Sequence, residues 1–250
     1  MDQIKIAFSL IFVYLICTTS SFAVDANLIQ ALESDIRSDD DKARDASRKP
    51  AETLEFFGVS EDSKVLELIP GRGWYTKILG TYLKDSGELS VAIGATEERL
   101  QLQENGLEHV NIIGEDFEMV STELHRGIRD VTGGSLGEDQ FDIVLTFRNI
   151  HNMSKLGREV VNKAVFDALK PGGIYGVIDH TKRHMEAFDS ERWRRVDPVE
   201  VIYELQAIGF IFEDYSDLHA RPKDTLVHDS THESINRDSD RFTLKFSKPL

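Results

Sequence analysis

Apolar residues recur along this chain in two patterns, short runs typical of buried strands and the wider spacing of amphipathic helices. The clearest example of a strand pattern followed by a helix pattern lies within residues 64–83, where Val65, Leu66 and Leu68 form a short apolar run. Apolar or aromatic side chains then follow at the spacing of one helical face: Tyr75, Ile78, Leu79, Tyr82 and Leu83. The stretch therefore predicts a buried strand, a loop with two glycines, and a helix.

Strands and helices alternate along the rest of the chain. The predicted strands are residues 88–93, 110–113, 141–147, 174–178, 210–213 and 242–246. The predicted helices are residues 25–37, 50–57, 96–104, 158–169 and 198–207. Lys170 to Gly173 predicts a turn, and residues 114–140 show no clear pattern. This alternation predicts an α/β fold with a mostly parallel sheet and right-handed crossovers.

The N-terminus has the pattern of a secretory signal peptide. Lys5 precedes an apolar run over residues 6–17, and the small residues Ser21 and Ala23 match a cleavage site. An uncleaved membrane anchor is the alternative. We expect cleavage after Ala23, which predicts an extracytoplasmic protein, periplasmic if the source is a Gram-negative bacterium, with no stable membrane insertion after cleavage. The mature chain would then comprise an N-terminal helical segment, residues 24–58, and an α/β domain, residues 59–250.

Composition excludes several kinds of chemistry. Cys17 is the only cysteine and lies in the predicted signal peptide, so a mature chain would have no disulfide, thiolate metal site or cysteine nucleophile. The chain has 29 basic and 44 acidic residues and a formal net charge of -15. This acidity argues against nucleic-acid binding, for which a basic stripe is expected.

The glycine loop predicts a ligand site. Gly71 and Gly73 would let a ligand approach the main chain, and Glu67 is placed at the carboxyl end of a strand, where α/β sheets bind ligands. A dinucleotide loop would have a third glycine where Thr76 stands, and the chain contains no Gly-Lys-Ser/Thr phosphate loop. A ligand with a nucleoside but no phosphates fits better, and a purely structural turn is the alternative.

Three motifs together resemble the class I S-adenosylmethionine-dependent methyltransferases. They are Glu67-Leu68-Ile69-Pro70-Gly71-Arg72-Gly73, Phe141-Asp142-Ile143-Val144 and Leu169-Lys170-Pro171-Gly172-Gly173. The likeness covers about residues 50–250. The chain is also similar to a group of exported methyltransferase-like proteins, whose shared motifs are represented here by Arg48-Lys49-Pro50, Phe147-Arg148-Asn149-Ile150-His151 and Asp240-Arg241-Phe242.

The resemblance implies a Rossmann-like three-layer sandwich with a seven-stranded, mostly parallel sheet and an antiparallel C-terminal hairpin. It implies S-adenosylmethionine as cofactor and S-adenosylhomocysteine as product. The positions that it implies for cofactor binding are Glu67, Pro70, Gly71, Gly73, Tyr75, Gly94, Asp116, Arg148 and Asn149. Glu67, Gly71 and Gly73 would flank the methionine part, and Asp116 would approach the adenine amino group.

Two features depart from the family pattern. The first and last glycines of the family's loop are Ile69 and Tyr75 here, and Gly94 stands where a carboxylate usually binds both ribose hydroxyls. Losing such a contact costs on the order of 1.5 to 3 kcal/mol per hydrogen bond. Unless Glu97 or Glu98 takes this role, we expect weak cofactor binding or a different ligand.

His151 is the predicted general base. Methyl transfer from a sulfonium requires an aligned nucleophile that loses a proton, and a histidine at the ligand end of the fourth strand could accept it. Asp179 and His180 end the fifth strand and would face the same site. A histidine hydrogen-bonded to loop backbone is the alternative.

Other histidines suggest weaker hypotheses. His180 and His184, with Asp179, could form a metal site. Their four-residue spacing would place both imidazoles on one face of a helix, but no helix is evident there. His219, His228 and His232 lie in a polar stretch that predicts a solvated loop. We therefore predict no bound metal.

The sequence leaves three functions open. The first is a methyltransferase acting on an unknown small-molecule acceptor outside the cytoplasm. The second is a non-catalytic ligand-binding protein that retains the methyltransferase fold, favoured by export away from the cellular source of the cofactor and by Gly94. The third is a metal-assisted hydrolase that uses His180 and His184.

Overall fold

The computed structural model describes residues 25–250 of the 250-residue chain. The predicted signal peptide, residues 1–23, lies outside the described residues. Among the helices that are described, none has the length and apolar character that crossing a membrane requires.

Seven strands form one sheet in the order β3-β2-β1-β6-β7-β9-β8. Their bounds are β1 Lys64–Leu68, β2 Glu88–Ala92, β3 Asn111–Ile113, β6 Phe141–Phe147, β7 Leu169–His180, β8 Ile211–Ser216 and β9 Arg241–Ser247. The first five neighbours pair in parallel, and β9 runs antiparallel to both β7 and β8. The predicted seven-stranded sheet with an antiparallel C-terminal hairpin is confirmed.

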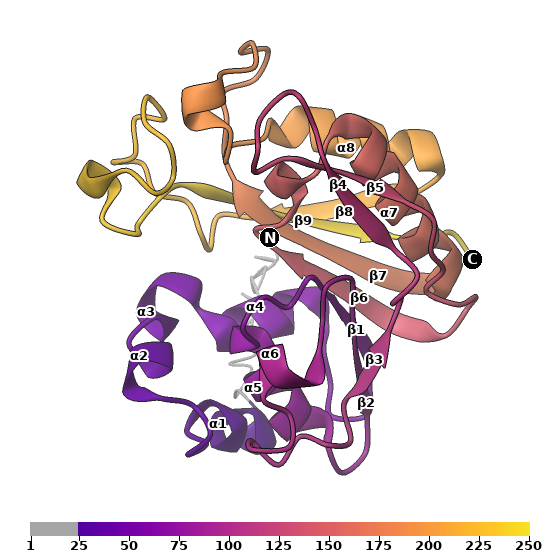
Figure 1. Ribbon diagram of the computed structural model, residues 1–250. Helices are drawn as coiled ribbons and strands as arrows, with labels where there is room; N and C mark the ends of the chain where they lie inside the picture. The colour runs from indigo at the N-terminus through magenta and orange to yellow at the C-terminus, as the bar shows by residue number, and fades with distance from the viewer. Residues whose placement is uncertain (1–24) are drawn as a thin grey trace, which may run out of the picture.

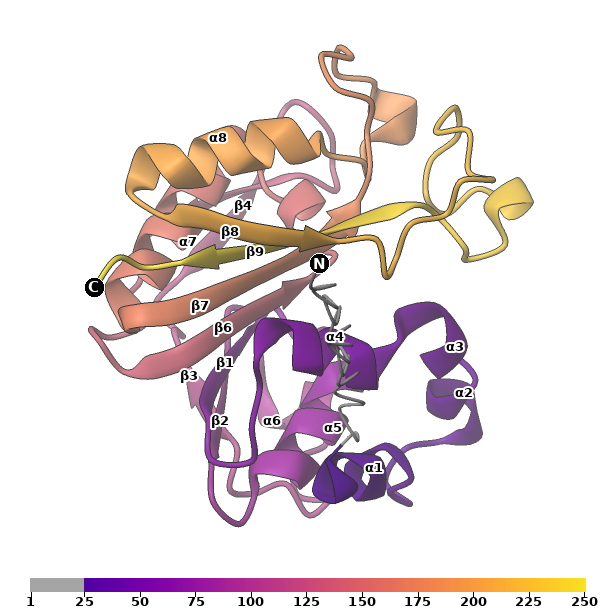
Figure 2. The same ribbon diagram turned by 180° about the vertical axis from the view of Figure 1, so that it is seen from behind.

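Helices cover both faces of this sheet (Figures 1 and 2). The helices are α1 Ala26–Leu32, α2 Asp39–Lys42, α3 Asp45–Arg48, α4 Pro50–Phe57, α5 Trp74–Leu83, α6 Glu97–Leu100, α7 Lys155–Ala168 and α8 Pro198–Ile208. One apolar core joins α1, α4 and α5 to one face, and a second joins α7 and α8 to the other. The result is a three-layer α/β/α sandwich.

The ends of α4 and α8 follow directly from their sequences. Pro50 and Pro198 each occupy the first turn, where a missing N–H costs no hydrogen bond. Gly58 ends α4 in a left-handed conformation with φ of 80°, and the side chain of Asp197 caps α8 by accepting from the Val199 amide. The predicted helices over residues 50–57 and 198–207 are confirmed.

Three predicted boundaries are wrong. The helix predicted over residues 25–37 ends at Leu32, since Glu33 is its C-cap. The helix predicted over residues 96–104 ends at Leu100, because Gln101 adopts a left-handed conformation with φ of 52°. The turn predicted at residues 170–173 lies inside β7 as an irregular segment, since Gly172 has φ of 78° and its amide donates to Lys248 beside it. Pairing with the C-terminal strand segment therefore keeps β7 continuous through this motif.

The unassigned residues 114–140 contain an extra antiparallel hairpin. Its strands are β4, Glu118–Ser121, and β5, Arg129–Thr132. A side chain at Gly157 of α7 would lie 2.9 Å from the Arg129 carbonyl oxygen, so this glycine lets the helix pack closely on β5. This contact holds the hairpin against α7.

Helix α4 is fixed to the sheet through Gly176 of β7. A methyl group at this position would lie 2.8 Å from the Phe57 ring and 2.7 Å from Leu145 Cδ2. Phe57 is fully buried, and only a glycine leaves room for its ring against the sheet. The N-terminal helical segment thus packs directly on the strand whose end contributes to the candidate site.

A buried acid joins β1 to the first turn of α5. Glu67 accepts a hydrogen bond of 2.6 Å from the Thr76 hydroxyl, and it is 3% exposed. Burial raises the pKa of Glu67 from 4.5 to about 7, although the Thr76 hydrogen bond and the charge of Arg48 oppose that shift. This contact closes the loop between strand and helix.

Replacing Gly176 with alanine should lower the free energy of unfolding by about 1 to 3 kcal/mol, because the added methyl group overlaps Phe57 and Leu145. Chemical denaturation of Gly176→Ala, Phe57→Leu and the double variant measures the coupling. The double variant should lose less than the sum of the two single losses, since leucine makes room for the methyl group. Strictly additive losses would contradict this packing.

Replacing Glu67 with glutamine should stabilise the protein, and the gain in unfolding free energy should grow with pH. The raised pKa means that the stability contributed by Glu67 is present below pH 4.5 and lost as the pH rises through about 7. Between pH 5 and 8 the unfolding free energy of Glu67→Gln should therefore rise by about 2 kcal/mol relative to the wild type. Glu108→Gln, at an exposed loop position, is the control and should show no such trend. A pH-independent difference for Glu67→Gln would refute the raised pKa.

Candidate functional site

The carboxyl edge of the parallel sheet concentrates unusual backbone conformations. The residue that directly follows each of β1, β2, β3 and β6 has a positive φ: Ile69 at 49°, Ile93 at 63°, Gly114 at 65° and Arg148 at 63°. For a β-branched residue this conformation is a true outlier, and such strain costs on the order of 1 to 3 kcal/mol per residue. Strain of this kind gathers at ligand sites, which makes this edge the candidate functional site.

The glycine loop leaves its main chain open to a ligand. Gly71 has φ of 65°, and apart from its two chain neighbours no heavy atom of residues 25–250 lies within 4 Å of the position that a Cβ would take. Gly73 has φ of 75° and precedes the first residue of α5, while its amide donates to the Pro70 carbonyl. Ile69 adopts the left-handed conformation at the position where the resembled family has a glycine. The backbone geometry is thus kept although the residue differs.

Asn149 ties the end of β6 to this loop. Its amide nitrogen donates to the Leu68 carbonyl at 3.1 Å and to the Ile69 carbonyl at 3.2 Å, and the side chain is buried. These bonds satisfy the backbone groups next to the strained residue. In this structure Asn149 supports the loop itself, while its predicted contact with a cofactor stays a prediction.

Aromatic side chains pack between the first turn of α5 and the end of β6. Tyr75 stacks on Phe147 with ring centroids 3.6 Å apart and an angle of 11°, and Trp74 meets Tyr75 edge-on at 4.7 Å. Burial raises the pKa of Tyr75 to about 12, so its hydroxyl stays neutral and is a poor proton acceptor. The tyrosine therefore builds the wall that joins α5 to the end of β6.

The extra hairpin lies against the residues that follow the end of β2. A side chain at Gly94 would lie 3.3 Å from the Cε of Met119, which belongs to the extra hairpin. Glu97 accepts from the Gln103 amide at 2.8 Å, so it is engaged along its own segment. Asp116 is exposed and accepts from the Ser135 amide at 3.4 Å. Met119, which the sequence did not single out, is thus the side chain that lies over position 94.

His151 and Asp179 form a buried pair at the ends of β6 and β7. Asp179 Oδ1 lies 2.6 Å from His151 Nδ1, and Oδ2 accepts from the His151 main-chain amide at 3.0 Å. A short 3₁₀ helix, Ile150–Asn152, carries the histidine. The carboxylate therefore holds the proton on Nδ1 and leaves Nε2 free as a proton acceptor.

His180 lies beside this pair, with its ring centroid 5.4 Å from that of His151. Its Nδ1 is 2.8 Å from the Ser239 hydroxyl. Burial, and then the charges of His151 and Arg148, keep the pKa of His180 well below its ordinary value, so the ring is neutral near neutral pH. The structure thus brings together the three residues that the sequence predicted as catalytic.

A cavity of about 370 Å³ opens next to His151. Residues from four segments line it, including Ile128, His151, Arg158, Phe188, Trp193 and Arg195. Its volume lies in the range of small-molecule sites. Trp193 is edge-on to His151 at 5.8 Å and stacks on His125 at 4.6 Å. The tryptophan therefore forms a wall of the cavity, and it packs on His125, a residue that the sequence patterns did not single out.

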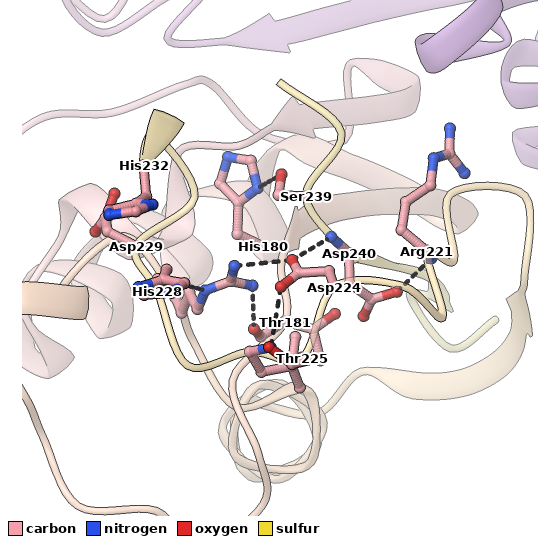
Figure 3. A network of polar contacts seen from close by, with 12 residues as sticks. His180, Thr181, Arg221, Asp224, Thr225, His228, Asp229, His232, Ser239 and Asp240 are labelled. Atoms are coloured by element: carbon pink, nitrogen blue, oxygen red, sulfur yellow. Dashed lines mark hydrogen bonds and ion pairs between the residues drawn. The ribbon is translucent and has the colours of Figure 1, made fainter. Parts of the chain in front are cut away.

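A polar network fixes the long segment of residues 217–240 over the end of β7. Arg195 forms a fully buried ion pair of 2.8 Å with Asp224 and also donates to the Thr181 carbonyl at 3.0 Å. Asp224 accepts from the Asp240 amide at 2.8 Å. Figure 3 shows Asp224, Asp240 and Ser239 gathered beside Thr181 and His180. The pair thus anchors the segment that contacts His180.

The remaining histidines have separate environments. His219 is buried, its Nε2 lies 2.8 Å from the Arg48 carbonyl, and burial lowers its pKa to about 4, so the expectation of a solvated loop is wrong at this residue. His184 lies 2.9 Å from Asp197, whereas His180 contacts Ser239. Within residues 25–250, no group of three or more His, Cys, Asp or Glu side chains is arranged to hold a metal ion.

Known proteins resemble the chain in sequence and in fold. No protein-family model matches it. An uncharacterised methyltransferase of Synechocystis sp. is 29% identical over 126 residues, 50% of this chain and 51% of that protein. The match therefore spans about half the length of this relative.

Solved structures match over most of the chain. An S-adenosylmethionine-dependent methyltransferase from Aquifex aeolicus has a TM-score of 0.58 and 14% identity, covering 90% of this chain and 100% of that one. The 1,6-didemethyltoxoflavin-N1-methyltransferase of Burkholderia thailandensis was solved with 1,6-didemethyltoxoflavin and S-adenosylhomocysteine. It has a TM-score of 0.54 and 16% identity, and the match covers 85% of this chain and 82% of that one. These TM-scores show a shared fold, and at identities this low the likeness extends to the fold alone. With its strand order, glycine loop and these likenesses, the chain has the fold of the class I S-adenosylmethionine-dependent methyltransferases.

Proposed function

We propose that this protein is an S-adenosylmethionine-dependent methyltransferase that acts on a small-molecule acceptor. The His151–Asp179 pair carries the proposal, because it places a proton acceptor on a cavity next to the end of β6. The glycine loop lies at the end of the adjacent strand β1. A methyl donor and an acceptor would therefore meet at neighbouring strand ends.

The residues at the strand ends fit the cofactor in part. The open space above Gly71 and the positive φ at Gly73 suit a ligand lying against the main chain. The Glu67–Thr76 contact and the Asn149 amide hold this loop in shape. When bound, the cofactor supplies an electrophilic methyl group. One contact does not fit the cofactor. Met119 lies over Gly94 and puts an apolar side chain where the resembled family binds the ribose hydroxyls.

The proposed chemistry divides among three side chains. His151 Nε2 accepts the proton of the acceptor nucleophile, and Asp179 fixes the imidazole in the tautomer that leaves Nε2 free. Asp179 also stabilises the imidazolium that forms. Trp193 walls the cavity and keeps water away from the acceptor.

A second candidate function is a non-catalytic binding protein of the same fold. The observation that favours it is again Met119 against Gly94, since a lost ribose contact weakens cofactor binding. For either function we propose an extracytoplasmic location, supported by the signal-peptide pattern of residues 1–23. The net charge of -15 supports a small molecule over a nucleic acid as partner.

Calorimetry with S-adenosylmethionine and S-adenosylhomocysteine tests the cofactor site. Gly71→Val should weaken binding at least about tenfold, because the branched side chain would occupy the open space over the loop. Gly106→Val is the matched control, since Gly106 has φ of 66° and equally open surroundings but lies in the loop that follows α6. Absence of binding by the wild type at millimolar ligand would refute the methyltransferase proposal.

The role of His151 can be tested by enzyme kinetics with an acceptor found by screening small molecules for S-adenosylhomocysteine release. His151→Ala should lower kcat by about 10² to 10⁴-fold, while leaving cofactor affinity within twofold. Asp179→Asn should also lower kcat, because its amide no longer fixes the tautomer. His232→Ala, an exposed histidine, is the control. A pH–rate profile that keeps its shape in His151→Ala would remove this residue as the base.

A further inference from the structure

Three arginines from distant parts of the chain meet at the carboxyl edge. Arg48 precedes α4, Arg148 follows β6 and Arg241 begins β9, and all three line one small cavity. The cavity also contacts Tyr75 and His219, and its volume of about 10 Å³ is close to that of a single water position. A fourth arginine, Arg44, adds positive charge beside Arg48.

The guanidinium groups in this cavity are short of partners. Among residues 25–250, neither Arg48 nor Arg148 donates a side-chain hydrogen bond or forms an ion pair; Arg48 instead lies 4.2 Å over the Trp74 ring. Arg241 donates to the Ser47 and Arg237 carbonyls, and its buried Nε has no partner within the described residues. Arg48 and Arg241 are buried, whereas Arg148 is partly exposed. Buried arginine N–H groups are normally paired, because an unmade hydrogen bond of a charged group is costly.

The carboxylates near these arginines are engaged elsewhere. Asp179, beside Arg148, binds His151. Asp238, beside Arg241, pairs with Arg221. Glu67, beside Arg48, accepts from Thr76 and has a raised pKa. The cavity therefore keeps an excess of positive charge in a chain whose net charge is -15.

This excess charge is unfavourable without a counter-ion. Burial, and then repulsion from Arg148 and Arg44, lower the pKa of Arg48 to about 8. Burial and repulsion from Arg148 lower that of Arg241 to about 10. An anion between the three groups would remove both penalties, and the fork of each guanidinium matches the oxygens of a carboxylate or phosphate.

We propose that Arg48, Arg148 and Arg241 form an oxyanion pocket that holds a carboxylate or phosphate group of the acceptor. The assignment rests on the proposed methyltransferase function and on position: Arg241 pairs in register with His180, and Arg148 lies three residues before His151. The methionine carboxylate of the cofactor has the same chemistry and is the other source of an anion. The side chains of Arg48 and Arg148 donate no hydrogen bond within residues 25–250, so they can reorient to admit the group.

Thermal unfolding with inorganic phosphate at low ionic strength tests the pocket without any cofactor. The Tm of the wild type should rise by about 3 °C at phosphate ten times above its dissociation constant. Arg148→Met should lose this rise, whereas Arg126→Met, in the exposed turn of the β4–β5 hairpin, should keep it. Without phosphate, Arg148→Met should unfold at the same temperature as the wild type or higher, since a repelling charge is gone. A lower Tm together with an unchanged phosphate response would show that the arginines are structural and would overturn the pocket.

A second measurement separates the two sources of the anion. S-adenosylhomocysteine carries the methionine carboxylate and 5′-methylthioadenosine does not, so both are titrated into the wild type and Arg148→Met. Equal affinity of the two proteins for S-adenosylhomocysteine, with the phosphate response lost, supports an acceptor anion. A tenfold loss for S-adenosylhomocysteine alone would assign the pocket to the cofactor and overturn the acceptor assignment. If neither nucleoside binds the wild type, the methyltransferase proposal fails, while the phosphate experiment still decides whether the pocket binds an anion.

Discussion

The structure depends on holding three strand ends in a backbone conformation that their own residues disfavour. Ile69, Ile93 and Arg148 take positive φ angles directly after β1, β2 and β6 end, and this strain must be balanced by contacts around it. The Asn149 amide supplies part of that balance by donating to two carbonyls at the end of β1. Because these turns aim the main chain out of the sheet, the same constraint creates the open loop at Gly71.

Electrostatics then divides this edge into two regions with different chemistry. Around His151, a buried carboxylate is paired with an imidazole and a neutral His180 lies beside them, so protons can be exchanged there. Around Arg48, positive charges meet without matched carboxylates from the described part of the chain, so an anion would be stabilised there. Arg148 lies between the two regions, since it lines the arginine cavity and its charge acts on both Asp179 and His180. An acceptor that carries an anionic group would be oriented by one region toward the other.

Local sequence patterns were sufficient to predict an element where residues within or next to it determine where it begins and ends. Helix α4 begins at Pro50 and stops at Gly58 by rules that involve only neighbouring residues, and β6 has the bounds that its apolar run predicts. The hairpin of residues 118–132 was not predicted, because its first strand is exposed throughout and lacks the apolar run of a buried strand. His219 was misjudged because its polar neighbours in sequence say nothing of Thr243 and Arg48, which bury it from other elements.

The sequence by itself determined the α/β order, the glycine loop, and the placement of His151, Asp179 and His180 at strand ends, because strand direction alone brings such residues to one edge. Only the tertiary structure decided which of these side chains touch, that Met119 lies over Gly94, and that Arg48, Arg148 and Arg241 share a cavity. Those relations join residues that lie 25 to 193 positions apart, from Met119 with Gly94 to Arg241 with Arg48. Contacts over such separations are set by how the layers pack, which no local pattern of residues records.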